Sequence, residues 1–171
     1  MPAEKKHKAI DKLLEQARED GMQAMMIYCN TLSGSLGMEY LFKKHIIPVV
    51  HPMMAYPKYA EEYKVVGLLG GGIQGPAAVE TVMLNANDKC KVLGVCNQLL
   101  VEAIDVGLSA DEIMEKFDMV SLMRYLESCG CESIILVCTH FPYLMEELVK
   151  CTKLPILDPT ELMYEMLLET S

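Results

Sequence analysis

Two cysteines in this sequence stand where a buried strand is expected to give way to a polar turn. Cys138 follows four apolar residues that favour β-structure and opens the segment Cys138–Tyr143, Cys-Thr-His-Phe-Pro-Tyr. Cys29 follows a shorter apolar run and opens the segment Cys29–Thr31, Cys-Asn-Thr. In open α/β sheets, ligands bind at the carboxyl ends of the strands. Both thiols are therefore candidates for chemistry on a bound ligand.

The surroundings of the two cysteines repeat along the chain. A glycine stands eight residues before Cys29 and another stands eight residues before Cys138. Each glycine follows a helical pattern and precedes an apolar run, as expected of a helix C-cap and a strand. Downstream, segments 47–52 and 154–159 each hold a proline within a short apolar run and end in a second proline. We interpret this as a duplicated helix, Gly, strand, Cys, helix and strand unit, although α/β units share some of these features.

Two thiols that face one cleft could move a proton next to a carbonyl group. One sulfur would remove the proton, and the other would deliver one from the opposite face, which is racemisation. A helix that starts after each cysteine would lower the thiol pKa, and the Gly70–Gly75 loop would add neutral N–H donors for a carboxylate. The alternatives are two structural cysteines, since free Cys is usually a small buried hydrophobe, and a metal site of Cys29, Cys138 and His140.

Composition narrows the classes of function. The 171 residues are 51% hydrophobic, enough for one domain or two small α/β lobes, and the net charge of -9 argues against nucleic acid and anionic membranes as partners. The seven cysteines are odd in number, no leader-like segment opens the sequence, and no apolar run reaches the length of a membrane span. We therefore expect a cytoplasmic protein with reduced thiols. No nucleotide-binding, pyridoxal-phosphate or zinc pattern is present, so we expect no cofactor and no metal.

Strand and helix patterns alternate along the chain, which predicts parallel sheets with helices packed outside them. Strands are expected over 24–28, 46–50, 65–69, 91–95, 134–137 and 154–157. Helices are expected over 4–20, 36–44, 56–63, 76–85, 98–106, a longer region 109–128 that starts with a capping box, 143–150 and 160–169. The duplication predicts two lobes, one formed by residues 1–62 with 146–171 and the other by residues 63–145.

At Cys29–Thr31 and Cys138–Tyr143 the sequence resembles the aspartate/glutamate racemase superfamily. Its members are cofactor-independent enzymes with one catalytic cysteine in each of two pseudo-symmetric α/β lobes. The resemblance implies that Cys29 and Cys138 are the acid/base thiols and that His140 assists Cys138. It also implies that three residues, Asn30, Thr31 and Thr139, bind the α-carboxylate and amino groups of a small acidic amino acid, glutamate or aspartate.

Several positions refine or depart from that resemblance. The His after Cys-Thr is similar to the glutamate racemase branch. The family's acidic residue in the short helix after the strand 91–95 matches Asp105, or less well Glu102. Where glutamate racemases have a Gly/Ala-Thr-x-x-Thr loop, this sequence has Gly70–Gln74. Substrate contacts are then expected from the backbone around Gly71 and from Gln74.

The largest departure lies before Cys29. Family members carry an opening strand with an Asp-Ser-Gly type motif, and no such motif precedes Cys29 here. We therefore expect a first lobe that lacks its opening strands, with an exposed sheet edge that would allow a homo-oligomer. The expected function is racemisation of glutamate or aspartate by two cysteines. The alternative is a truncated, inactive homologue that binds acidic amino acids or acts as a partner subunit.

Overall fold

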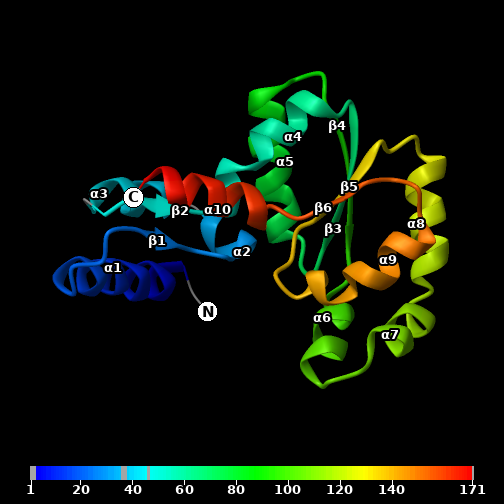
Figure 1. The fold of residues 1–171 in the computed structure, drawn as a ribbon, viewed down its shortest axis with the longest axis horizontal. Coiled ribbons are helices and arrows are strands. Elements are labelled where there is room, and N and C mark those ends of the chain that lie inside the picture. Colours follow the sequence, from blue (N-terminus) through cyan, green and yellow to red (C-terminus); the bar gives the residue numbers. More distant parts are fainter. Residues whose placement is uncertain (1–2, 36–37, 46, 171) are drawn as a thin grey trace.

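The computed structural model describes residues 3–35, 38–45 and 47–170. Within these residues the strands form two parallel sheets: β1 pairs with β2, and a four-stranded sheet has the order β4-β3-β5-β6. The predicted α/β fold with parallel sheets and flanking helices is confirmed (Figure 1). The strands are β1 (Met25–Met26), β2 (Val49–Val50), β3 (Val65–Gly70), β4 (Lys91–Cys96), β5 (Ser133–Leu136) and β6 (Ile156–Leu157).

Helices connect the strands and cover both sheets. The α-helices are α1 (Ala3–Glu19), α2 (Asn30–Ser33), α3 (Met38–Lys44), α4 (Tyr56–Glu62), α5 (Gln74–Ala86), α6 (Gln98–Asp105), α7 (Ala110–Lys116), α8 (Met119–Ser128), α9 (Met145–Cys151) and α10 (Thr160–Glu169). Two short 3-10 helices, η1 (Pro52–Met54) and η2 (Phe141–Leu144), precede α4 and α9.

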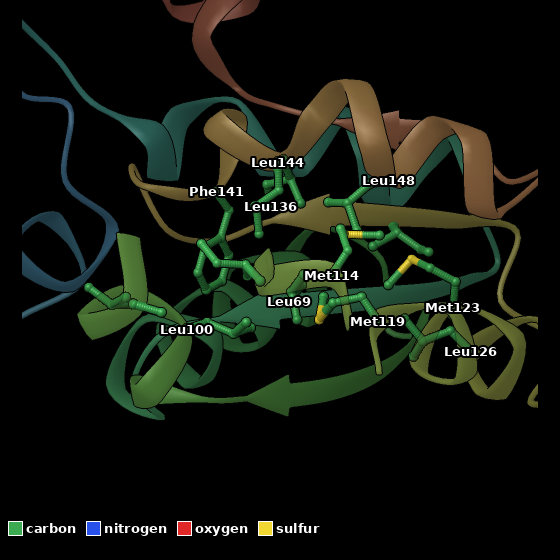
Figure 2. Close-up of a cluster of buried hydrophobic side chains, with 14 of the residues drawn as sticks. Leu69, Leu100, Met114, Met119, Met123, Leu126, Leu136, Phe141, Leu144 and Leu148 are labelled. Carbon is green, nitrogen blue, oxygen red and sulfur yellow. The ribbon is translucent and has the colours of Figure 1, made fainter. Parts of the chain in front are cut away.

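The centre of the larger sheet is apolar on both faces, because helices pack against each side of it. All four residues of β5 are buried, as expected of a central parallel strand. On one face, a cluster of buried side chains joins β3 and β5 to α6, α7, α8 and α9. Figure 2 shows this cluster, with Leu69 and Leu136 from the sheet and Phe141, Leu144 and Leu148 from the η2–α9 segment. On the other face, α4 and α5 cover the sheet.

The smaller sheet has its own core and its own helices. Leu14 and Ala17 of α1 pack with Ile27 and with Leu41 and Phe42 of α3. Helix α10 crosses from the end of β6 to contact β1 and β2, so the end of the chain covers the smaller sheet (Figure 1). Within the described residues, β1 has β2 as its single strand neighbour.

The duplicated unit expected from the sequence is visible in three dimensions. Gly21 follows α1 with φ of 72°, and Gly130 follows α8 with φ of 81°. At each helix end the residue after the glycine bonds back five positions, Met22 N to Ala17 O at 3.0 Å and Cys131 N to Leu126 O at 3.2 Å. This is the Schellman arrangement, which requires a left-handed residue and so favours glycine. The strand after each glycine leads to a cysteine and pairs in parallel with the next proline-flanked strand.

Several element boundaries differ from the sequence expectation. The region 109–128 has the predicted capping box at Ser109 and Glu112 but is two helices, because Asp118 adopts a left-handed conformation with φ of 44°. Helix α5 starts at Gln74 rather than at Pro76, which occupies its first turn. In the smaller sheet each of the two strands is two residues long, shorter than expected. Parts of the expected segments 36–44 and 46–50 lie outside the described residues.

The division into lobes stays a prediction, with one point of detail from the sheets. Strand β6 lies within 146–171, the segment that the sequence assigns to the first lobe, yet it pairs with β5 of the larger sheet. Helix α10, in the same segment, contacts β1 and β2 of the smaller sheet. The chain therefore returns to the smaller sheet after Leu157 rather than after residue 145.

Candidate active site

Cys138 lies just beyond the carboxyl end of β5. The sheet extends to the preceding residue, because Val137 N donates to Leu69 O at 2.8 Å. The turn that follows closes with a bond from Phe141 N to Cys138 O at 3.0 Å, and the Phe141 ring is fully buried in the cluster of Figure 2. The buried Phe141 ring therefore holds the half-buried residues Cys138, Thr139 and His140 at the carboxyl end of β5.

His140 connects Cys138 to a carboxylate from a different helix. Its Nδ1 atom lies 3.6 Å from Cys138 Sγ, within the range of a hydrogen bond to sulfur. Its Nε2 atom lies 3.0 Å from Asp105 Oδ1 at the end of α6. Helix α6 is held by the buried side chains of Leu100 and Val101, which leave Asp105 exposed at its C-terminal end. The three side chains form a thiol–imidazole–carboxylate series of the kind in which the third group orients the second.

Burial raises the pKa of the Cys138 thiol above its ordinary value of 9.0. The backbone N–H groups of His140 and Gly71 donate to the sulfur and lower the pKa, while the charges of Cys29 and Asp105 raise it further. The expectation that a helix N-terminus lowers the pKa of Cys138 is wrong. The free-energy cost of placing the charged thiolate in a buried site exceeds the stabilisation from the two N–H donors.

The glycine loop after β3 approaches Cys138 closely. A Cβ atom on Gly71 would lie 3.5 Å from Cys138 Sγ and only 2.6 Å from Val101 Cγ2, so the buried position has no room for a side chain. The side-chain oxygen of Gln98 lies 3.8 Å from the same point. Gly71 therefore belongs to the Cys138 site through its backbone, whereas Gln98 is a neighbour of the loop that sequence reasoning missed.

Cys29 lies half-buried between the end of β1 and the short helix α2. Thr31 of α2 comes near the first turn of α5, where a Cβ atom on Gly75 would lie 3.5 Å from Thr31 Oγ1 and 3.5 Å from Val137 O. The segment after Cys29 and the end of β5 therefore meet at the start of α5. The carboxyl ends of the two cysteine strands converge there, as the duplication predicts.

Two of the residues expected to bind substrate, Asn30 and Gln74, have different surroundings from each other in the structure. Asn30 is 3% exposed, and its side-chain oxygen accepts a hydrogen bond from the Tyr56 hydroxyl. Gln74 is exposed and lines, with Thr31, a hollow of about 480 Å³ that also borders Lys6 of α1. The structure thus brings together Cys138, His140, Asp105 and Gly71, with Cys29 among the charges that act on the Cys138 thiol.

Neither a metal centre nor a membrane span is found in residues 3–35, 38–45 and 47–170. No group of three or more His, Cys, Asp or Glu side chains in this part of the chain has an arrangement able to hold a metal ion. The alternative metal site of Cys29, Cys138 and His140 is therefore not formed there. Of the helices in the same residues, none is both long enough and apolar enough to cross a bilayer.

The comparison with known families agrees with the paired cysteine motifs. The family model described as Asp/Glu/Hydantoin racemase matches residues 2–167. The chain belongs to this racemase family. The resemblance stated from the sequence is confirmed at the level of the family, and the fold of the family's solved members agrees with the sheets described above.

Glutamate racemases are among the relatives of this racemase-family chain. It is 27% identical over 136 residues to the glutamate racemase of Pseudomonas putida, covering 77% of this chain and 51% of that protein. The glutamate racemase of Francisella tularensis, solved in complex with D-glutamate, superposes with a TM-score of 0.74 at 19% identity and covers 99% of this chain and 66% of its own. An aspartate racemase homologue from Pyrococcus horikoshii superposes with a TM-score of 0.70 at 18% identity, covering 96% and 74%. The chain therefore spans about half the length of the curated relative from Pseudomonas putida.

Two further polar residues of this racemase-family chain lie beside the site and were not singled out from the sequence. Tyr28 directly precedes Cys29, and its hydroxyl donates to Asp158 Oδ2 at 2.9 Å. The duplicated segments 47–52 and 154–159 held a signal for Asp158, because both place a polar residue, His51 or Asp158, directly after the strand. This pattern indicates where a strand ends, but it does not predict which residue Asp158 contacts.

Proposed function

We propose that this chain carries a two-cysteine proton-transfer site that racemises a small acidic amino acid, glutamate or aspartate. The observation that supports the proposal most directly is the series from Cys138 Sγ to His140 Nδ1 at 3.6 Å and from His140 Nε2 to Asp105 Oδ1 at 3.0 Å. Membership of the racemase family supports it further, as does the meeting of the segment after Cys29 with the end of β5 at the start of α5. The chemistry would need no cofactor.

The series gives Cys138 a way to lose and regain a proton. With Asp105 accepting from Nε2–H, the Nδ1 atom of His140 carries the lone pair and can accept the proton of the Cys138 thiol. The carboxylate then stabilises the imidazolium that forms. Because burial keeps the pKa of Cys138 high, the thiol is the resting form and can also act as the acid. Asp105 would orient His140, and His140 would assist Cys138.

Cys29 would act from the opposite face of the substrate's Cα. In one direction a thiolate removes the Cα proton and the other thiol donates a proton to the planar intermediate, and the roles exchange in the reverse direction. The intermediate carries negative charge next to the substrate carboxylate, where neutral donors are needed. The groups that would supply them are the side chains of Thr31 and Thr139, together with the backbone near Gly71.

Solvent deuterium incorporation at Cα tests this proposal. The purified chain would be incubated in D₂O with each enantiomer of glutamate and of aspartate, and exchange would be followed by NMR. We expect exchange in the wild type and its loss in Cys29→Ser and Cys138→Ser, because serine is a far weaker acid than cysteine at the same position. Exchange that survives both substitutions would exclude the two-thiol mechanism.

A second candidate function is binding without turnover, either of an acidic amino acid or as a partner subunit. The observation that favours it is a smaller sheet of two strands in the described residues. Calorimetric binding of glutamate or aspartate without any Cα exchange would select this function. The unpaired strand edge would allow a homo-oligomer, and sedimentation of the same sample measures it. Cytoplasmic localisation stays a prediction of the sequence.

A further inference from the structure

One hydrogen bond joins the two cysteine-bearing halves of the chain beside the candidate site. The Tyr28 hydroxyl donates to Asp158 Oδ2 at 2.9 Å across 130 positions of sequence. Tyr28 directly precedes Cys29 and belongs to the segment that leaves β1. Asp158 directly follows β6. This strand pairs with β5, the strand that leads to Cys138. The bond therefore ties the smaller sheet to the larger one.

The Asp158 carboxylate is held on its other side as well. Its Oδ1 atom accepts from Thr160 N at 2.8 Å and from the Thr160 hydroxyl at the start of α10. The Tyr59 hydroxyl donates to the Asp158 backbone carbonyl at 3.1 Å. The carboxylate is held in place, because it cannot change rotamer without losing its two bonds from Thr160.

The smaller sheet gives Cys29 little support of its own. Within the described residues β1 pairs with β2 alone, and the pairing ends with Ile27 N donating to Val50 O at 2.8 Å. Cys29 does not cap α2 with its side chain. The next side-chain tie to the rest of the chain is the one from Asn30 to Tyr56. Tyr28 and Asn30 thus supply side-chain bonds on the two sides of Cys29, and the one from Tyr28 leads to the end of β6.

We propose that Tyr28 and Asp158 are positioning residues that set the Cys29 thiol relative to Cys138. This inference rests on the proposed two-cysteine function and deepens it. The Tyr28 hydroxyl holds the end of β1 against the end of β6. Because β6 pairs with β5, the same bond holds the end of β1 relative to the turn at Cys138. This would fix the distance between the two thiols on opposite faces of the substrate's Cα. The rate of proton transfer depends steeply on that distance.

Tyr28 acts as a hydrogen-bond donor to Asp158 rather than as an acid or base in the reaction. Burial raises the pKa of Tyr28 to about 12, and the charges of Asp158 and Cys138 raise it as well. The hydroxyl therefore stays protonated at neutral pH and keeps donating to Asp158.

The first test measures the position of Cys29 without requiring activity. Alkylation by iodoacetamide would be followed separately at Cys29 and Cys138 by peptide mass spectrometry in the full chain. We expect Tyr28→Phe to change the Cys29 rate by roughly two- to tenfold, the range set by the loss of one hydrogen bond, with a smaller change at Cys138. The matched control is Tyr59→Phe, which removes a hydroxyl bonded only to the Asp158 backbone, and it should leave both rates near wild type.

A double substitution shows whether the bond itself is responsible. If Tyr28 acts through Asp158, then Tyr28→Phe should have little further effect on the Cys29 rate in an Asp158→Asn background. Full additivity of the two substitutions, an unchanged Cys29 rate in Tyr28→Phe, or an equal change in Tyr59→Phe would each overturn the inference.

The second test separates the inference from the proposed function. 3-Chloroglutamate loses its Cα proton and then chloride, so elimination from each enantiomer needs only the thiol on one face. Tyr28→Phe should slow elimination from the same enantiomer that Cys29→Ala affects and spare the one that Cys138→Ala affects. If the wild type eliminates neither enantiomer, the alkylation result alone decides the positioning role. The proposed function fails if Cα exchange is also absent with both glutamate and aspartate. Equal slowing of both enantiomers in an active protein would contradict that role.

Discussion

His140 Nε2 lies 3.0 Å from Asp105 Oδ1, although 35 positions of sequence separate the two residues. One comes from the turn after β5 and the other from the end of α6. The apolar cluster of Figure 2 holds both segments, through Phe141 on one side and Leu100 on the other. Packing of the core therefore determines the geometry of a polar pair at its rim.

Replacing Asp105 tests that pair. Asp105→Asn should lower Cα exchange by about 10- to 100-fold, because His140 loses the carboxylate that orients it and stabilises its charged form. The same substitution removes a negative charge that raises the pKa of Cys138, so the curve of Cys138 alkylation against pH should move to lower pH. Glu102→Gln, an exposed carboxylate one turn earlier on α6, is the control and should behave as wild type. A Glu102 effect as large as that of Asp105 would contradict the assignment.

Gly71→Ala should disturb the site through the backbone. The added Cβ would lie 2.6 Å from Val101 Cγ2, so the loop must move and the N–H donor to Cys138 moves with it. We expect exchange to fall by about 10- to 100-fold, the scale of a misplacement near 1 Å. At the neighbouring Gly72 the nearest atom to a new Cβ is Gln98 Oε1 at 3.8 Å, so Gly72→Ala should be tolerated. Equal effects of the two substitutions on exchange would argue against a role for the Gly71 N–H.

Tyr56→Phe should destabilise the fold. Tyr56 is fully buried, and its hydroxyl donates to Asn30, which is 3% exposed. Loss of the donor leaves a buried amide oxygen unpaired, which costs about 1 to 3 kcal/mol of unfolding free energy. Urea denaturation followed by circular dichroism measures the change. The control is Tyr143→Phe, which removes an exposed hydroxyl bonded to Leu108 O and should cost much less.

The protein should lose stability in mild acid because of His51. Burial lowers the pKa of His51 from 6.5 to about 4, so between these values the unfolded chain binds a proton that the folded protein does not. The contribution of the neutral ring is fully present above pH 6.5 and is lost as the pH falls toward 4, a change of about 2 to 3 kcal/mol. Urea midpoints measured from pH 7 to pH 4 should fall less steeply in His51→Gln than in the wild type. Parallel curves for the two proteins would show that His51 is not the group responsible.

The sequence alone determined the elements that carry the cysteines. Apolar runs, the left-handed glycines Gly21 and Gly130 and the capping box at Ser109 and Glu112 are local features, because each depends on residues within one or two turns. They predicted a parallel α/β fold and a duplicated strand–cysteine unit, and the resemblance of the Cys29 and Cys138 motifs predicted the family. The same local patterns overestimated the strands of the smaller sheet, since pairing there depends on a neighbouring strand rather than on the strand's own residues.

Only the tertiary structure decided which side chains meet. It paired His140 with Asp105 rather than Glu102, directed Asn30 to Tyr56, and joined Tyr28 to Asp158 across 130 positions. It also reversed the expected direction of the Cys138 pKa, because burial depends on everything packed around the thiol. Contacts of this kind follow from strand register and from the packing of helix faces on a shared core. Neither is encoded in any single stretch of the chain.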